Sequence, residues 1–233
     1  MALNSLDLSV VLPAYQEEEN LRVLLPRLLK TLKSMDLSYE VLVIDTINPI
    51  DMTKEVCEIN QVRYLNRGVD NYFGSAVRTG IKEANGKYII FMDADGSHPP
   101  EFIPELFCFA DKYDVVIASR YVDKGRTENS LALIVMSRIV NWTFSIILNL
   151  PCKDVSNSFK VYRGKQLKNI KLTCNNFDIV EEILFKLRRS QSLMTFKEVP
   201  FVFKKRMFGK TKRNLFIFII TYIFTIIKLR FKS

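Results

Sequence analysis

The 233-residue sequence is short of histidine, glycine, proline and cysteine, and each shortage excludes a class of protein. Its one histidine, His98, excludes a metal site built from several histidines. Eight glycines and eight prolines, together with 48% hydrophobic residues, exclude a collagen-like, disordered or low-complexity chain. Four cysteines without a CxxC spacing are too few for a disulfide scaffold, so reduced thiols are expected. Residues 1–15 have neither a basic start nor a long apolar run, so no secretory signal is expected.

Acidic residues are absent after Glu198, although nine lysines and arginines follow it. Removing those nine from the 34 basic residues leaves 25, which balance the 25 acidic residues of the chain. A neutral body therefore carries a cationic tail that accounts for the net charge of +9. Such a tail suits an anionic partner, such as a phospholipid surface or a phosphorylated substrate.

Short apolar runs alternate with helical patterns between residues 7 and 119. The runs predict strands at 7–12, 40–45, 62–65, 87–92 and 114–119, and the helical spacings predict helices at 21–32, 52–59, 73–84 and 100–110. This alternation predicts an α/β fold with a mainly parallel sheet covered by helices on both faces. Ligands of such sheets bind beyond the carboxyl ends of the strands, where Asp45, Asp93 and Asp95 stand.

Two long apolar segments lie in the C-terminal half. Residues 131–150 are long enough to span a bilayer, but an arginine near the centre, Arg138, costs about 2.5–3.5 kcal/mol on insertion scales. A surface or interfacial helix is therefore expected there. Residues 215–229 would rise only about 22 Å as a helix, against roughly 30 Å of hydrocarbon. Because basic residues flank it, this segment is expected to lie in the membrane interface. The chain is therefore expected to consist of a domain at 1–213 and a tail helix at 214–233.

The segment Asp93-Ala94-Asp95 directly follows an apolar strand. Two carboxylates one residue apart can share a hard divalent cation, Mg²⁺ or Mn²⁺, with the phosphates of a substrate. Such a cation would neutralise a diphosphate leaving group. An isolated pair of this kind is more often a solvated turn, and it is the position at a strand end that favours a metal site.

Several motifs follow one another along the chain. They are VLPAYQEE at 11–18, Asp45 at the end of the second strand, DADGSHPPE at 93–101, SRY at 119–121 with Gly125, and EVP…F…R…G…TK between 198 and 212. Taken in this order, from about residue 8 to 213, they resemble family 2 glycosyltransferases, above all dolichol-phosphate mannosyltransferases and bacterial polyprenyl-phosphate glycosyltransferases. The resemblance implies a GT-A fold and a nucleotide-sugar donor.

The resemblance also implies roles for single residues. The nucleotide would be held by Pro13, Tyr15, Glu17, Asp45 and Asp93, and the metal by Asp93 and Asp95. The catalytic set would be Asp93, Asp95, Arg120 and Arg206, and the acceptor phosphate would meet Arg138, Arg206 and Lys212. Arginine suits phosphate because its planar fork can donate two hydrogen bonds at once. The sequence departs from the family pattern at 46–51 and at 154–160, which leaves the base and the acceptor open.

Several of these residues also have a structural interpretation. The role of Glu17 could be purely structural, as a carboxylate that stabilises the start of a helix, and that of His98 as the cap of a turn. Arg138 could reach out from an interfacial helix without contacting substrate. Glu181 and Glu182, on an amphipathic helix expected over 178–188, are assigned to its solvated face.

The expected activity is inverting, metal-dependent transfer of a sugar from a nucleotide diphosphate sugar to a polyprenyl or dolichyl phosphate. The enzyme is expected at the cytoplasmic face of an anionic membrane, as a peripheral or monotopic protein. A saccharide acceptor is the first alternative, and it would require a carboxylate base. A non-catalytic basic membrane adaptor is the second, but it would not need Asp93 and Asp95. A nucleic-acid-binding protein is disfavoured as well, because these carboxylates would repel the phosphates of nucleic acid. A dinucleotide-binding oxidoreductase is excluded because no GxGxxG follows the first strand.

Overall fold

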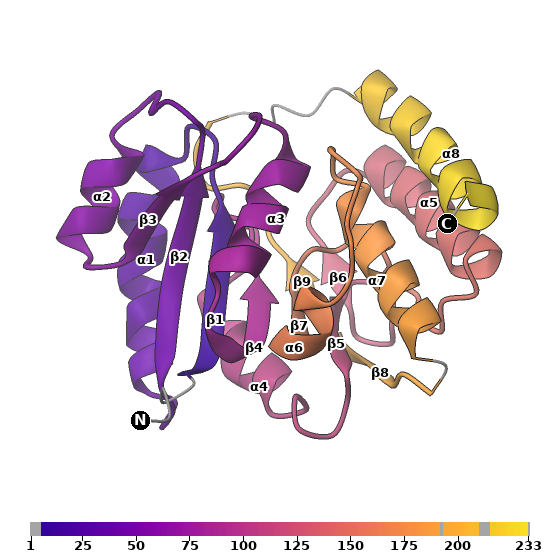
Figure 1. The fold of residues 1–233 in the computed structure, drawn as a ribbon, viewed down its shortest axis with the longest axis horizontal. Coiled ribbons are helices and arrows are strands. Elements are labelled where there is room, and N and C mark those ends of the chain that lie inside the picture. Colours follow the sequence, from indigo (N-terminus) through magenta and orange to yellow (C-terminus); the bar gives the residue numbers. More distant parts are fainter. Residues whose placement is uncertain (1–5, 192, 210–214, 233) are drawn as a thin grey trace.

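A seven-stranded sheet forms the centre of the computed structural model, which describes residues 6–191, 193–209 and 215–232 (Figure 1). Its order is β3 (Arg63–Asn66), β2 (Tyr39–Asp45), β1 (Leu6–Pro13), β4 (Gly86–Phe91), β7 (Lys160–Arg163), β5 (Val115–Ser119) and β8 (Phe196–Pro200). All neighbouring strands are parallel except that β7 runs antiparallel to both β4 and β5. A short parallel pair, β6 (Arg126–Thr127) and β9 (Val202–Phe203), stands beside the main sheet. The expected α/β fold with a mainly parallel sheet is confirmed.

Side chains alternate between the two faces of each strand and build one apolar core on either side of the sheet. In β1, Val11 belongs to the first core, whereas Val10 and Leu12 belong to the second. The first core is covered by α3 (Phe73–Glu83), α5 (Leu131–Ile147), α6 (Gly164–Lys168), α7 (Ile179–Ser190) and α8 (Leu215–Lys232). The second is covered by α1 (Glu18–Lys33), α2 (Thr53–Ile59) and α4 (Ile103–Phe107). Five of the α1 leucines at this helical spacing are fully buried, and each stabilises the fold by about 1.5–3 kcal/mol: Leu21, Leu24, Leu25, Leu28 and Leu32. The sixth, Leu29, is partly buried against the same core.

The helix expected over residues 100–110 is shorter and begins differently. A 3₁₀ turn, η1 (Pro100–Phe102), comes first, and α4 ends at Phe107. An α-helix starting at Pro100 would need the N–H of residue 104 to reach the carbonyl of Pro100, but Pro104 has no N–H. The N–H of Ile103 bonds that carbonyl instead, which makes the first turn 3₁₀.

The assignment of Glu181 and Glu182 to a solvated face of α7 is wrong, because both are fully buried. The segment before α7 folds over Glu182, whose carboxylate accepts the N–H groups of Thr173 and Cys174. Glu181 lies deeper, and burial raises its pKa to about 7 although Tyr222 of α8 acts in the opposite direction. The amphipathic pattern does not reveal this, because α7 is covered on its polar side as well.

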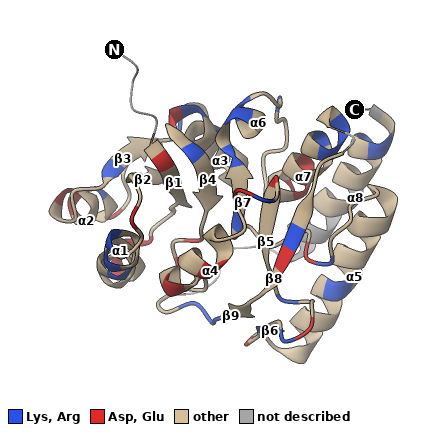
Figure 2. Ribbon diagram, turned by 90° about the horizontal axis from the view of Figure 1, so that it is seen from below, with Lys and Arg blue, Asp and Glu red and all other residues tan. Residues whose placement is uncertain are grey.

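The helices α5 and α8 lie side by side at one end of the molecule (Figure 1), with the Phe144 and Tyr222 rings in edge contact. Their other faces are apolar and exposed, with Trp142 68% exposed and Phe231 79% exposed. Figure 2 shows no acidic residue on either helix, one basic band on α5, and the basic residues of α8 gathered near its C-terminal end. Within the described ranges, no helix is both long enough and apolar enough to cross a membrane. The predicted domain boundary between residues 213 and 214 lies outside the described residues.

Candidate active site

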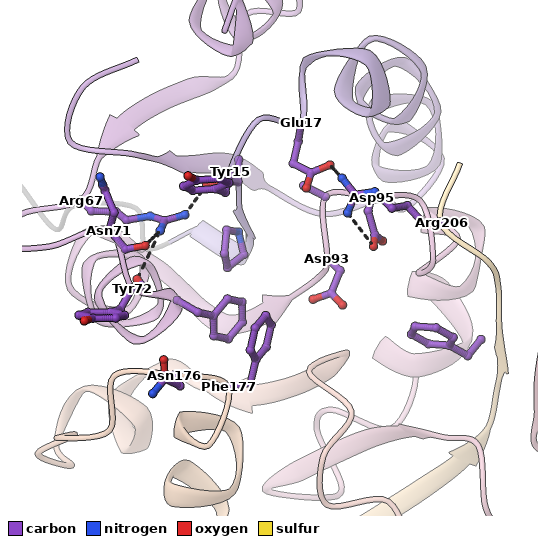
Figure 3. Close-up of a pocket in the computed structure, with 15 residues that line it drawn as sticks. Tyr15, Glu17, Arg67, Asn71, Tyr72, Asp93, Asp95, Asn176, Phe177 and Arg206 are labelled. Carbon is purple, nitrogen blue, oxygen red and sulfur yellow. Dashed lines mark hydrogen bonds and ion pairs between the residues drawn. The ribbon is translucent and has the colours of Figure 1, made fainter. Parts of the chain in front are cut away.

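A cavity of about 490 Å³ opens at the carboxyl ends of β1, β3 and β4. Six of the predicted site residues line it: Pro13, Tyr15, Glu17, Asp93, Asp95 and Arg206. Figure 3 shows the carboxylates and Arg206 at one end, with Tyr15, Arg67 and Tyr72 at the other. The parallel arrangement explains the clustering, since segments that leave neighbouring strands at the same edge meet there.

The two aspartates after β4 are each fixed by a serine. The Ser158 hydroxyl donates to Oδ1 of Asp93 over 2.7 Å. Oδ1 of Asp95 accepts the N–H and the hydroxyl of Ser97, at 3.0 and 2.6 Å. One oxygen of each carboxylate is thereby oriented, and both side chains stay partly accessible from the cavity.

His98 is fully buried below this turn, and its hydrogen bonds define its protonation. Nδ1 accepts the N–H of Asp93 over 2.9 Å, so Nε2 carries the proton and donates it to Oδ1 of Asn157 over 3.0 Å. Asn157 in turn donates to the carbonyl of Ala118. Burial lowers the pKa of His98 and so keeps the ring neutral, while the two hydrogen bonds select the tautomer. His98 therefore acts on the position of Asp93 rather than as a ligand in the cavity.

Arg206 joins the C-terminal segment to this end of the cavity. Its guanidinium pairs with Glu17 and lies 3.4 Å from Oδ2 of Asp95. Burial by itself lowers the pKa of Arg206, but the hydrogen bond to Glu17 and the neighbouring carboxylates more than offset this and raise it. The guanidinium therefore stays charged among carboxylates.

The backbone of the same segment runs along the Asp93–Asp95 turn. The N–H of Met207 bonds the carbonyl of Asp95, and the N–H of Lys204 bonds the carbonyl of Ser97. Gly96, with φ +81°, allows the close approach, because a Cβ there would lie 2.5 Å from the Met207 methyl carbon. The turn and the C-terminal segment thus form one side of the cavity together.

The carboxylates fit a hard divalent cation. A serine bonds one oxygen of each carboxylate. The second oxygen lies 3.4 Å from Arg206 in Asp95 and 3.8 Å from Nε2 of His98 in Asp93. In the part of the chain that the structure describes, no group of three or more His, Cys, Asp or Glu side chains could hold a metal ion alone. The arrangement therefore suits a cation shared by two carboxylates and a substrate's phosphates.

Three other predicted site residues, Asp45, Arg120 and Arg138, do not line the cavity. Asp45 is buried behind it and accepts the Tyr64 hydroxyl over 3.0 Å, and burial raises its pKa. Arg120 is engaged in a buried two-bond ion pair with Asp154. Its guanidinium lies against the rings of Tyr121 and of Phe203, a cavity residue.

Arg138 is exposed on α5, and its guanidinium lies 5.6 Å from the Tyr121 ring centroid. Arg120 and Arg138 thus share one aromatic neighbour beside the cavity rather than inside it. Lys212 lies outside the described residues. The roles of these residues remain predictions.

Sequence reasoning missed much of the cavity wall, namely Arg67, Asn71, Tyr72, Phe73, Asn176 and Phe177. Arg67 follows β3 directly, so the rule that singled out Asp45 and Asp93 could have found it. It donates to the carbonyls of Ala14 and Asn71 and ties two wall segments together. Asn176 and Phe177 come from a loop more than 100 residues after Arg67, and no local pattern marks them.

Comparison with known proteins identifies the family. The profile described as "Glycosyl transferase family 2" matches residues 9–170, which is more than half of the chain. The chain belongs to glycosyl transferase family 2. This family 2 glycosyltransferase therefore carries the two aspartates that line its cavity inside the matched region, whereas Arg206 lies beyond it.

Relatives and solved structures agree with this assignment. A dolichol-phosphate mannosyltransferase of Pyrococcus furiosus is 34% identical over 211 residues, covering 88% of this chain and 58% of that protein. The chain thus spans little more than half of that relative's length. A protein of the same name from Saccharomyces cerevisiae is 28% identical, covering 89% of this chain and 81% of its own. The structure of glucosyl-3-phosphoglycerate synthase from Mycobacterium tuberculosis with Mn²⁺, UDP and glucosyl-3-phosphoglycerate superposes with a TM-score of 0.73 at 16% identity. It covers 96% of this chain and 80% of that one, and it supports the GT-A type of fold.

Proposed function

We propose that this glycosyltransferase moves a sugar from a nucleotide diphosphate sugar to a polyprenyl phosphate, with inversion and with a divalent metal. The observation that carries the proposal is the group of Asp93, Asp95 and Arg206 at one end of a cavity at the strand ends. The mannosyltransferase names of two relatives support a lipid-phosphate acceptor, and the Mn²⁺ and UDP bound to the M. tuberculosis enzyme support the donor and the metal.

The donor's diphosphate would lie at the carboxylate end of the cavity. Asp93 and Asp95 would hold Mg²⁺ or Mn²⁺, which when bound supplies positive charge to the leaving diphosphate. Pro13, Tyr15 and Glu17 would hold the nucleotide from one wall of the cavity. Arg67 fixes that wall by a hydrogen bond to the carbonyl of Ala14. Because these groups are fixed before substrate arrives, little reorganisation is needed during the reaction.

The acceptor would supply its own nucleophile. A phosphate monoester has a second pKa of about 6, so its oxygen is already anionic near neutral pH and needs no general base. The chain's task is then to align an in-line displacement, and a single displacement inverts the anomeric carbon. Arg206, charged and at the cavity, is the candidate for gripping that phosphate, with Arg138 and Lys212 as further candidates.

The lipid would reach the cavity from α5 and α8. The exposed apolar faces of these helices suit the acyl boundary of a bilayer, and Arg138, Lys228 and Arg230 suit anionic headgroups at its cytoplasmic face. The test is binding to anionic liposomes after Trp142→Ser on α5 or Phe231→Ser on α8. Each change should weaken binding at least severalfold, and liposome binding as strong as that of wild type in both would contradict this orientation.

A saccharide acceptor remains the second candidate for this fold. The M. tuberculosis neighbour has glucosyl-3-phosphoglycerate bound, in which the glucosyl group is joined to a small soluble molecule and not to a lipid, and this favours a soluble acceptor in general. Donor binding itself is tested by the thermal stability of the wild-type protein with nucleotide diphosphates and Mn²⁺ or Mg²⁺. A ligand at 100 times its Kd stabilises by about 2.7 kcal/mol, and Asp95→Asn should abolish the metal-dependent part. No stabilisation by any nucleotide would contradict the proposed donor.

A further inference from the structure

The cavity wall opposite Pro13 and Tyr15 is made by residues 173–178, here called the wall loop. Its Asn176 and Phe177 line the cavity (Figure 3). The Phe177 ring stacks on the Phe73 ring, with centroids 4.4 Å apart and planes 19° apart. The loop therefore sets the width of the cavity, and its attachments decide where Phe177 lies.

On one side the wall loop is attached to the start of α3. The N–H of Gly74 bonds the carbonyl of Asn175 over 2.7 Å, and Arg78 donates to the carbonyl of Cys174 over 2.6 Å. A Cβ at residue 74 would lie 2.3 Å from that Cys174 carbonyl oxygen, so only glycine permits this contact.

On the other side the wall loop is attached to α7 and to the C-terminal helix. Oδ1 of Asp178 accepts the N–H of Asn176 over 3.1 Å, while Oδ2 of the same carboxylate accepts the hydroxyl of Thr225 of α8. Asp178 and Thr225 are both buried. Lys228, one helical turn further along α8, donates to the Thr173 hydroxyl over 2.9 Å. One carboxylate thus bridges the cavity wall and the C-terminal helix.

We propose that α8 holds one wall of the donor pocket in place, and that Thr225 is a positioning residue that acts through Asp178 on Asn176 and Phe177. Without the Thr225 hydroxyl, Oδ2 of the buried Asp178 carboxylate loses a hydrogen-bond donor, and the carboxylate, which also contacts the Cys174 thiol of the wall loop, must turn or take up water. Either response competes with the bond from Asp178 to the Asn176 N–H, and it frees the wall loop on the side away from α3. The helix that the proposed function places at the membrane would thereby also hold the nucleotide site in shape, and this inference rests on that function for the identity of the donor.

The test compares Thr225→Val with Thr225→Ser in the full-length protein, with Thr143→Val on α5 as the matched control. Thr143 makes its hydroxyl bond to Ile139 inside its own helix, so the control removes the same atoms without touching the wall loop. Kd for UDP and for GDP with Mn²⁺ is measured by calorimetry, and amide hydrogen exchange is followed across residues 173–178. Thr225→Val should raise Kd for whichever nucleotide binds by about 3- to 10-fold and speed exchange of the wall loop. Thr225→Ser should stay within about twofold of wild type in both readouts, and Thr143→Val should match wild type.

Wild-type values of both readouts in Thr225→Val would overturn the proposal. If that variant does not fold, Lys228→Met replaces it, with Lys168→Met on α6, an exposed lysine without an assigned role, as the control for lost charge. Lys228→Met should then speed exchange at residues 173–175 and raise Kd, and unchanged values would overturn the proposal equally. If wild-type protein binds neither nucleotide, the proposed donor fails, whereas the exchange comparison still decides whether α8 holds the wall loop.

Discussion

Replacing Arg206 by alanine removes the cation that stands between Glu17 and Asp95. The guanidinium is 19% exposed and the Glu17 side chain 9% exposed, so solvent screens this pairing less than it screens a surface ion pair. A hydrogen bond to a charged group contributes about 1.5–3 kcal/mol. If Arg206 grips the acceptor phosphate in the transition state, kcat/KM for a polyprenyl phosphate should fall by about 10- to 150-fold. Hydrolysis of the donor by water should fall far less, since water needs no such grip.

The assay measures initial rates of sugar transfer and of donor hydrolysis in the same reaction. Lys204→Ala is the matched control, because Lys204 lies in the same segment but pairs with Glu128 at the surface, where a salt bridge contributes about 0–1 kcal/mol. The control should keep kcat/KM within about fivefold of wild type, and Arg206→Lys should recover only part of the loss. Equal losses in Arg206→Ala and Lys204→Ala would refute the reasoning. Equal losses of transfer and hydrolysis in Arg206→Ala would assign Arg206 to the donor instead.

Three further predictions concern the proposed metal site and the buried Glu181. Asp95→Asn should abolish transfer while circular dichroism stays unchanged, and EDTA should inhibit wild type; turnover that survives both changes would exclude the metal role. Ser158→Ala removes the hydroxyl that orients Asp93, and it should raise the Mn²⁺ concentration needed for half-maximal activity by about 3- to 20-fold with a smaller change in kcat at saturation. Glu181 has its pKa raised to about 7 from the ordinary 4.5, so the folded state binds more protons and the wild type loses this stability as the pH rises from 4.5 through 7. As the pH rises from about 4.5 to 8, the free energy of unfolding of Glu181→Gln should therefore increase relative to that of wild type by up to about 3 kcal/mol. Urea unfolding at several pH values measures this difference. A difference between the two proteins that does not change with pH would contradict the burial argument.

The first half of the fold could be predicted because its strands are continuous apolar runs and its helices carry one apolar face. Burial on both faces imposes those runs, as Val10 and Val11 show by entering different cores. The strand β7 could not be predicted in the same way. Four residues, Lys160–Arg163, carry too little pattern, and their antiparallel place between β4 and β5 follows from tertiary packing alone.

The same distinction between local sequence pattern and tertiary packing applies to the residues of the candidate site. Asp93 and Asp95 could be predicted because they directly follow a strand, and Arg206 because a family motif marks it. Phe177 could not, because a loop remote in sequence brings it to the cavity through contacts with Gly74, Arg78 and Asp178. Burial of Glu181 and Glu182 was missed because helical periodicity reports one covered face, whereas α7 is covered on two.

Transfer of labelled sugar to lipid tests the central claim most directly. Full-length protein is incubated with Mn²⁺, a panel of radiolabelled nucleotide diphosphate sugars, and either a polyprenyl phosphate in anionic vesicles or the same vesicles with the dephosphorylated polyprenol. The account predicts label in the organic phase only with the phosphorylated lipid, only with metal, and not with Asp95→Asn. Label that reaches a soluble saccharide but no lipid fraction, or that reaches polyprenol as readily as its phosphate, would contradict it.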